Sequence, residues 1–119
     1  MGLGPGIELE LFRIVKTDVA GDLLDCFTSS FALDRPPRGW EQRSTVIHMG
    51  LSMFERPRQA SATAHRYPQL GSYIARVHLA AQHGFGVART GPPGHMTVWG
   101  RPLEFFHGVV EISSVDEHA

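Results

Sequence analysis

The stretch from Ile7 to Lys16 reads IELELFRIVK and predicts the first strand of the fold. Its apolar residues alternate, as expected of a half-buried strand. The alternation gives one face four aliphatic side chains: Ile7, Leu9, Leu11 and Val15. Arg13 falls on the same face, where an unpaired guanidinium would be costly to bury. We therefore expect Arg13 either to pair with Asp34, Glu111 or a backbone carbonyl, or to bind an anionic ligand in a cleft.

Outward from this strand, the pattern predicts several more short elements. Further strands are expected at 44–49, 73–79, 85–88, 95–99 and 109–112. Short helices are expected within 18–31, up to Tyr67, and from Pro102 to Gly108. The middle helix has two candidate starts, because Ser52 and Glu55 have capping-box spacing and Pro57 suits a first helical position. The elements interleave irregularly, which predicts an α+β fold, mainly antiparallel, with split small sheets and two or three short helices.

Length and composition predict one soluble domain. The chain has 119 residues, of which 42% are hydrophobic, and we assign 1–119 to a single domain with flexible ends at 1–6 and 114–119. A net charge of −1 argues against a polybasic arm, although residues 35–101 contain nine arginines and two acidic residues. Cys26 is the only cysteine, so no internal disulfide forms. Neither a leader peptide nor a membrane span is recognisable, and we expect a cytoplasmic protein.

Two segments carry side chains suited to chemistry. His48 and Ser52 bracket a turn at Gly50, and they either face a cleft or serve as an ordinary strand residue and a helix cap. The segment from Arg89 to Gly100 reads RTGPPGHMTVWG and predicts a tight loop followed by a strand. That strand presents three side chains on one face: His95, Thr97 and Trp99. An imidazole, a hydroxyl and an aromatic surface can hold a nucleotide, and the alternative is a plain hairpin with a core tryptophan. The seven histidines show no metal-ligand spacing, so no metal is expected.

The order of these motifs resembles small ADP-ribosyltransferase-like domains, including RES-type toxins and the tRNA 2′-phosphotransferase catalytic domain. The resemblance rests on LFR at 11–13, HMGLS at 48–52, a helix with Ala60 and Ala64, and YIARVHL at 73–79. The stretch 9–112 is also similar to small uncharacterised bacterial proteins. The family resemblance implies NAD or an ADP-ribosyl group bound in a cleft between two small sheets.

By that resemblance, Arg13 would bind phosphate or ribose, and His48 and Ser52 would lie at the nicotinamide end as catalytic groups. Tyr73 would lie beside the nicotinamide, while His95, Thr97 and Trp99 would complete the cofactor site. The catalytic Glu of the family has one placed candidate here, Glu111, and no Glu-x-Glu pair occurs. A carboxylate stabilises the positive charge that develops when the glycosidic bond to nicotinamide breaks. We therefore expect a protein that binds or cleaves NAD or an ADP-ribosyl group, such as a toxin or modifier.

Two other functions remain open from the residues alone. The basic middle of the chain suits a nucleotide- or RNA-binding module, or a small RNase in which His48, His78 or His95 serve as acid and base. The acidic ends and basic middle also suit a non-catalytic, antitoxin-like interaction domain with a protein partner or in a homodimer.

Overall fold

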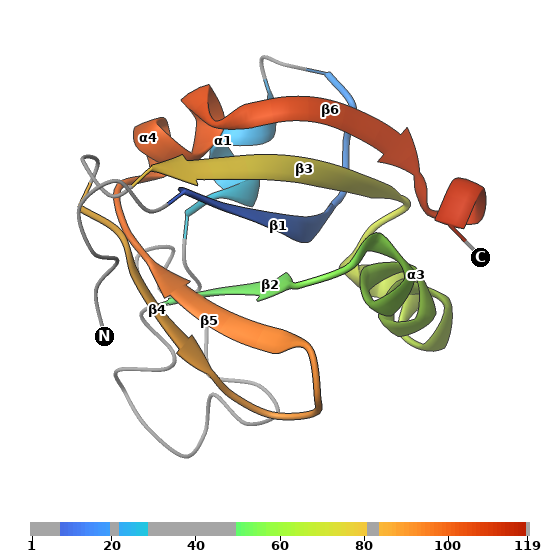
Figure 1. The fold of residues 1–119 in the computed structure, drawn as a ribbon. Coiled ribbons are helices and arrows are strands. Elements are labelled where there is room, and N and C mark those ends of the chain that lie inside the picture. The colour runs from blue at the N-terminus through green and yellow to red at the C-terminus, as the bar shows by residue number, and fades with distance from the viewer. Residues whose placement is uncertain (1–7, 20–21, 29–49, 81–83, 119) are drawn as a thin grey trace.

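The fold is built on one antiparallel sheet. The computed structural model describes residues 8–19, 22–28, 50–80 and 84–118 (Figure 1). Within them, six strands pair in the order β4-β5-β2-β1-β3-β6. Their bounds are Glu8–Val15 (β1), Leu51–Phe54 (β2), Tyr73–Ala80 (β3), Gly86–Arg89 (β4), His95–Trp99 (β5) and Val109–Ser114 (β6). The predicted α+β class with a mainly antiparallel sheet is therefore confirmed.

The predicted split into two small sheets takes a different form. The strands make a single sheet, but β1 and β2 are joined at only one register pair, Phe12 with Phe54. By contrast, β1 pairs with β3 along all eight of its residues. We call β4-β5-β2 and β1-β3-β6 the two half-sheets, and the Phe12–Phe54 pair their junction.

Short helices cover the two faces of the sheet. The α-helices are Leu23–Cys26 (α1), Pro57–Arg66 (α3) and Pro102–His107 (α4), and the 3-10 helices are Pro68–Leu70 (η3) and Val115–His118 (η5). Figure 1 shows α3 in front of the sheet and α1 behind it. Two buried clusters follow from this arrangement, one including Leu11, Phe27 and Phe105 on the α1 and α4 face, and one including Phe54 and Ile74 against α3.

Local patterns explain where these helices begin. Pro57 is the first residue of α3, which confirms that start and excludes Ser52 as the cap. The side chain Oε1 of Gln59 instead accepts a hydrogen bond from the backbone N–H of Arg56 at 3.1 Å. Ala60 and Ala64 are buried, so the helix packs closely on the sheet. Pro102 opens α4, and Gly108 follows its last residue.

Three expectations meet the structure only in part. The second strand among the described residues is Leu51–Phe54, and the strand predicted at 44–49 lies outside those residues and stays a prediction. The helix predicted within 18–31 is the single turn of α1 where the chain is described. Residues 115–118 form η5, in which Val115 is buried and its carbonyl accepts a hydrogen bond from Ser61 Oγ at 2.8 Å; flexibility of the ends at 1–6 and 114–119 stays a prediction. The single-domain assignment stays a prediction.

No helix in the described part of the chain has the length and apolar character needed to cross a membrane. A cytoplasmic location stays a prediction.

Candidate functional site

Arg13 lies beside the junction of the half-sheets and links three elements. Its Nε donates a hydrogen bond to the carbonyl of Cys26 in α1 at 2.6 Å. Its Nη1 donates to the carbonyl of Ser52 in β2 at 2.7 Å. Both bonds are partly buried, and both acceptors are backbone oxygens. The expectation that Arg13 pairs with a backbone carbonyl is therefore met.

The position of Arg13 explains why a guanidinium occurs among aliphatic neighbours. The register between β1 and β2 contains one pair, so a side chain of β1, rather than its backbone, bonds the carbonyl of Ser52. A buried carbonyl without a donor costs free energy. Arg13 supplies that donor, and its second hydrogen bond holds α1 beside the junction of the half-sheets.

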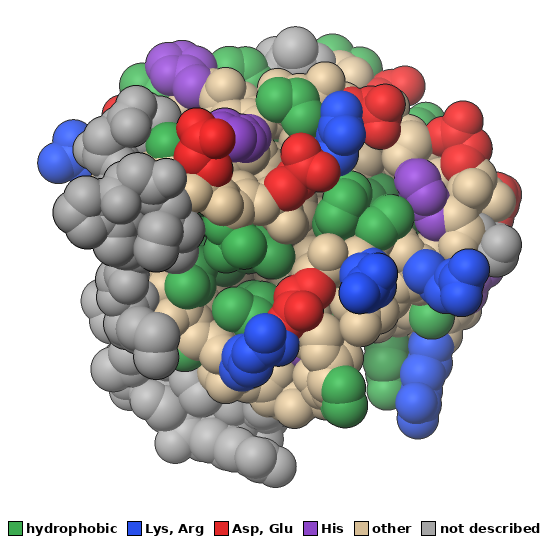
Figure 2. Space-filling view, viewed as in Figure 1, with side chains coloured by type: hydrophobic (Ala, Val, Ile, Leu, Met, Phe, Trp, Pro, Cys, Tyr) green, Lys and Arg blue, Asp and Glu red, His purple; other side chains and the backbone are tan. Residues whose placement is uncertain are grey.

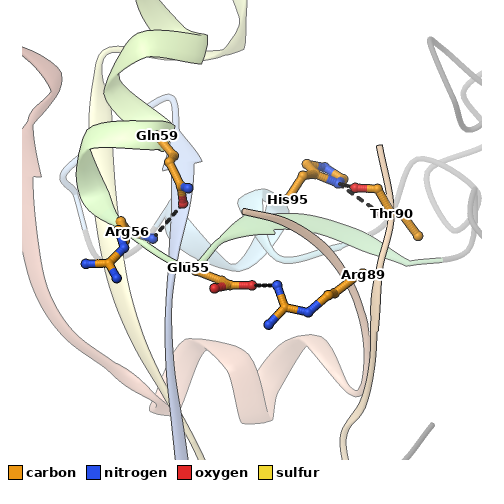
Figure 3. A network of polar contacts seen from close by, with 6 residues as sticks. All are labelled: Glu55, Arg56, Gln59, Arg89, Thr90 and His95. Carbon is orange, nitrogen blue, oxygen red and sulfur yellow. Dashed lines mark hydrogen bonds and ion pairs between the residues drawn. The ribbon is translucent and has the colours of Figure 1, made fainter. Parts of the chain in front are cut away.

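A second polar group lies at the β4–β5 hairpin (Figure 3). The ring Nδ1 of His95 lies 2.8 Å from the carbonyl oxygen of Thr90 and 3.0 Å from its Oγ1. Thr90 Oγ1 also lies 2.6 Å from Thr97 Oγ1. His95 and Thr97 are 1% and 2% exposed, whereas Thr90 is half-buried, so the network lies at the edge of the core.

The contacts of His95 define its protonation. A carbonyl oxygen only accepts, so Nδ1 carries the proton that it donates to Thr90. Burial lowers the pKa of His95 below 6.5, and the bond to the Thr90 carbonyl opposes that shift in part. At neutral pH the ring is uncharged, with Nε2 as its acceptor nitrogen.

The β4–β5 hairpin also contacts Glu55, which lies between β2 and α3. Arg89 and Glu55 form an ion pair (Figure 3). The backbone N–H of Glu55 also donates to the carbonyl of Gly94 at 2.9 Å. Gly94 has a φ of +84°, and a methyl group there would overlap the Gln59 side chain. The loop before His95 is therefore held by α3 as well as by its own strands.

The predicted site residues divide between the two faces of the sheet. Ser52 is the register partner of Thr97, so its side chain shares the face of His95, Thr97 and Trp99. Arg13 is the register partner of Ala75 and points to the opposite face. Arg13 reaches Ser52 only through the backbone carbonyl of that residue.

The remaining predicted residues lie farther from this region. Tyr73 packs at the edge of the core on the Arg13 face, two residues along β3 from Ala75. Glu111 is exposed on β6, three strands away from β2. Three strand spacings correspond to about 14 Å, so Glu111 is not brought to the Ser52 hydroxyl. His48 lies outside the described residues.

Sequence reasoning missed Thr90 and the ion pair between Glu55 and Arg89. Thr90 could have been found, because the register of a hairpin across the loop at 91–94 places the residue after β4 opposite His95. The ion pair depends on the position of β2 next to β5, which no local pattern encodes.

Among the described residues, no group of three or more His, Cys, Asp or Glu side chains is placed to hold a metal ion. Comparisons of the chain with protein-family models, with curated proteins and with solved structures find no match.

Proposed function

We propose that this protein binds an ADP-ribosyl dinucleotide of the NAD type at the junction between its two half-sheets. The observation that carries the proposal is the position of Arg13. The first-strand arginine lies where the ladder between β1 and β2 is one pair long, and its guanidinium donates to the carbonyl of Ser52 in β2 and to the carbonyl of Cys26 in α1.

The chemistry of the surrounding side chains supports this ligand. A guanidinium held by two carbonyls keeps a fixed orientation, which lowers the entropy lost when it meets a diphosphate. Ser52 offers a partly buried hydroxyl for ribose, and Trp99 offers a partly exposed ring for a base. These side chains lie on the face opposite Arg13. The proposal requires that the dinucleotide contact both faces of the sheet beside the one-pair ladder between β1 and β2.

Binding is better supported than cleavage. Glu111, the carboxylate expected for cleavage, lies on β6 and away from Ser52. His95 is buried and its Nδ1–H is bonded to the Thr90 carbonyl within the hairpin, so that group is not presented to a bound ligand. The proposed activity is therefore recognition of the dinucleotide, with no chemical step assigned.

Isothermal titration calorimetry with NAD and with ADP-ribose tests the proposal. We expect saturable binding to the wild type and binding at least tenfold weaker in Arg13→Gln. Arg13 also stabilises the fold, so Ser52→Ala serves as a second variant, with an expected weakening of about threefold. Arg101→Gln removes an exposed arginine elsewhere and should bind like the wild type.

Two results would contradict the proposal. One is a folded wild type that binds neither NAD nor ADP-ribose at millimolar concentration. The other is an Arg13→Gln protein that melts cooperatively and binds the dinucleotide with wild-type affinity.

A further inference from the structure

The outward face of α3 carries positive charge without compensating acids on the same helix. Ala60, Ser61 and Ala64 are buried against the sheet. On the opposite side, four side chains are exposed: Arg58, Ala62, His65 and Arg66. The helix contains no acidic residue. Figure 2 shows several Lys and Arg side chains over α3, while acidic side chains lie mainly over β1, β3, β6 and the neighbouring η5, which contains Asp116 and Glu117.

Few contacts neutralise this face. His65 Nε2 lies 3.4 Å from Asp116, which borders the face at η5. Within the described residues, neither Arg58 nor Arg66 forms an ion pair. The Arg66 guanidinium instead lies over the ring of Tyr67, 5.5 Å from its centroid, and Tyr67 is 44% exposed. An aromatic ring therefore extends the basic face at the end of the helix.

Helix stability accounts for only part of these charges. Cations are favourable near the carboxyl end of a helix, which explains Arg66. Arg58 is the second residue of α3 and Arg56 is its N-cap, where the helix dipole disfavours positive charge. Basic residues at both ends of one helix fit a surface that meets an anionic partner.

We propose that the outer face of α3, together with Tyr67, binds single-stranded nucleic acid. Arg58 and Arg66 are separated by about 12 Å along the helix axis, so they contact separate phosphates. Tyr67 supplies a surface on which an unpaired base stacks, the combination of charge and aromatic ring typical of single-strand binding. The positive charge of Arg58 and Arg66 favours a polyanion as the partner, and the exposed ring of Tyr67 favours one with unpaired bases. This inference is independent of the dinucleotide site.

Fluorescence anisotropy with labelled U12 RNA and dT12 DNA, measured from 50 to 200 mM salt, tests this proposal. We expect binding that weakens steeply with salt. The double variant Arg58→Ala/Arg66→Ala should bind at least tenfold more weakly, and its slope of log affinity against log salt should be smaller by about 1.4. Tyr67→Ala should bind at least fivefold more weakly, because a stacked base is lost.

The matched control is Arg76→Ala/Arg101→Ala, which removes the same charge from β3 and the start of α4. It should retain binding within about twofold, and circular dichroism melting checks that every variant is folded. The proposal is overturned if the wild type does not bind either oligonucleotide at 50 mM salt, or if the control loses as much affinity as the α3 variant.

Two further outcomes also overturn it. Equal binding of polyglutamate, with no effect of Tyr67→Ala, would show a surface for acidic protein segments. A dimer in analytical ultracentrifugation that Arg58→Ala/Arg66→Ala dissociates would assign this face to a second copy of the chain. Loss of oligonucleotide binding with intact NAD binding separates this surface from the junction.

Discussion

Replacing Gly94 with alanine tests how the loop before His95 is anchored. Gly94 has a φ of +84°, a conformation that costs alanine about 1–2 kcal/mol. The lower entropy of the unfolded alanine chain offsets about 0.4–1 kcal/mol of this. The added methyl also displaces the Gln59 side chain, whose bond to the Arg56 N–H contributes about 1 kcal/mol. Gly94→Ala should therefore lower the free energy of unfolding by about 2 kcal/mol.

Gly84 provides a matched control. It has a φ of +76°, and no atom of the described residues lies within 4 Å of an added methyl group. Gly84→Ala therefore carries the backbone strain alone, and we expect a loss of about 1 kcal/mol. Urea unfolding measures both losses, provided that the dependence of the free energy of unfolding on urea concentration is the same for the two variants. The melting temperature should fall by roughly 4 °C per kcal/mol lost.

A double variant isolates the contact itself. In Gly94→Ala/Gln59→Ala the displaced side chain is absent, so the double variant should be about 1 kcal/mol more stable than the sum of the single effects. Equal losses for Gly84→Ala and Gly94→Ala, together with strict additivity of the pair, would refute the reasoning.

Three further perturbations address the remaining polar contacts. Arg13→Met removes two hydrogen bonds from a charged donor, and we expect urea unfolding to show a loss of about 2–3 kcal/mol in the free energy of unfolding. The control Arg76→Met breaks an exposed ion pair and should lose under about 1 kcal/mol. Equal losses would contradict the role of Arg13 at the junction. An NMR titration should show that the pKa of the His95 side chain lies below 6.5. Because the unfolded chain then binds the proton more tightly than the folded chain, the free energy of unfolding of the wild type should fall relative to that of His95→Gln as pH drops below about 6.5. If the free energies of unfolding of both proteins change equally with pH, this linkage is excluded. Ser61→Ala should cost about 1 kcal/mol and speed amide exchange in η5, where its hydroxyl bonds the Val115 carbonyl; unchanged exchange would argue that η5 is held by other contacts.

Strands with strong alternation could be predicted from sequence. The strands at β3 and β5 and the face assignment of β1 follow from a period of two, and α4 follows from Pro102 and Gly108. The strand β2 could not be predicted, because Ser52 and Glu55 have the spacing of a capping box and so indicate the start of a helix. Pairing of β2 with β5, far along the chain, decides its conformation.

The candidate site was predictable only as a set of residues. Arg13 is unusual on an aliphatic face, so sequence alone identified it as a residue needing a partner. Its acceptors are carbonyls of Cys26 and Ser52, and any residue type supplies a carbonyl. The register of β2 then placed the Ser52 side chain on the other face, a result that depends on pairing and not on composition.

The β4–β5 hairpin bears on the order in which the chain folds. Among the described strands, β4 and β5 are the only paired strands joined by a tight loop, and every other pairing closes a long stretch of chain. Local hairpins form within microseconds, whereas distant pairings are slow. The buried contacts of Thr90, His95 and Thr97 therefore lie in the first piece of sheet expected to form. The junction at Phe12 and Phe54 would close late, when both half-sheets already exist.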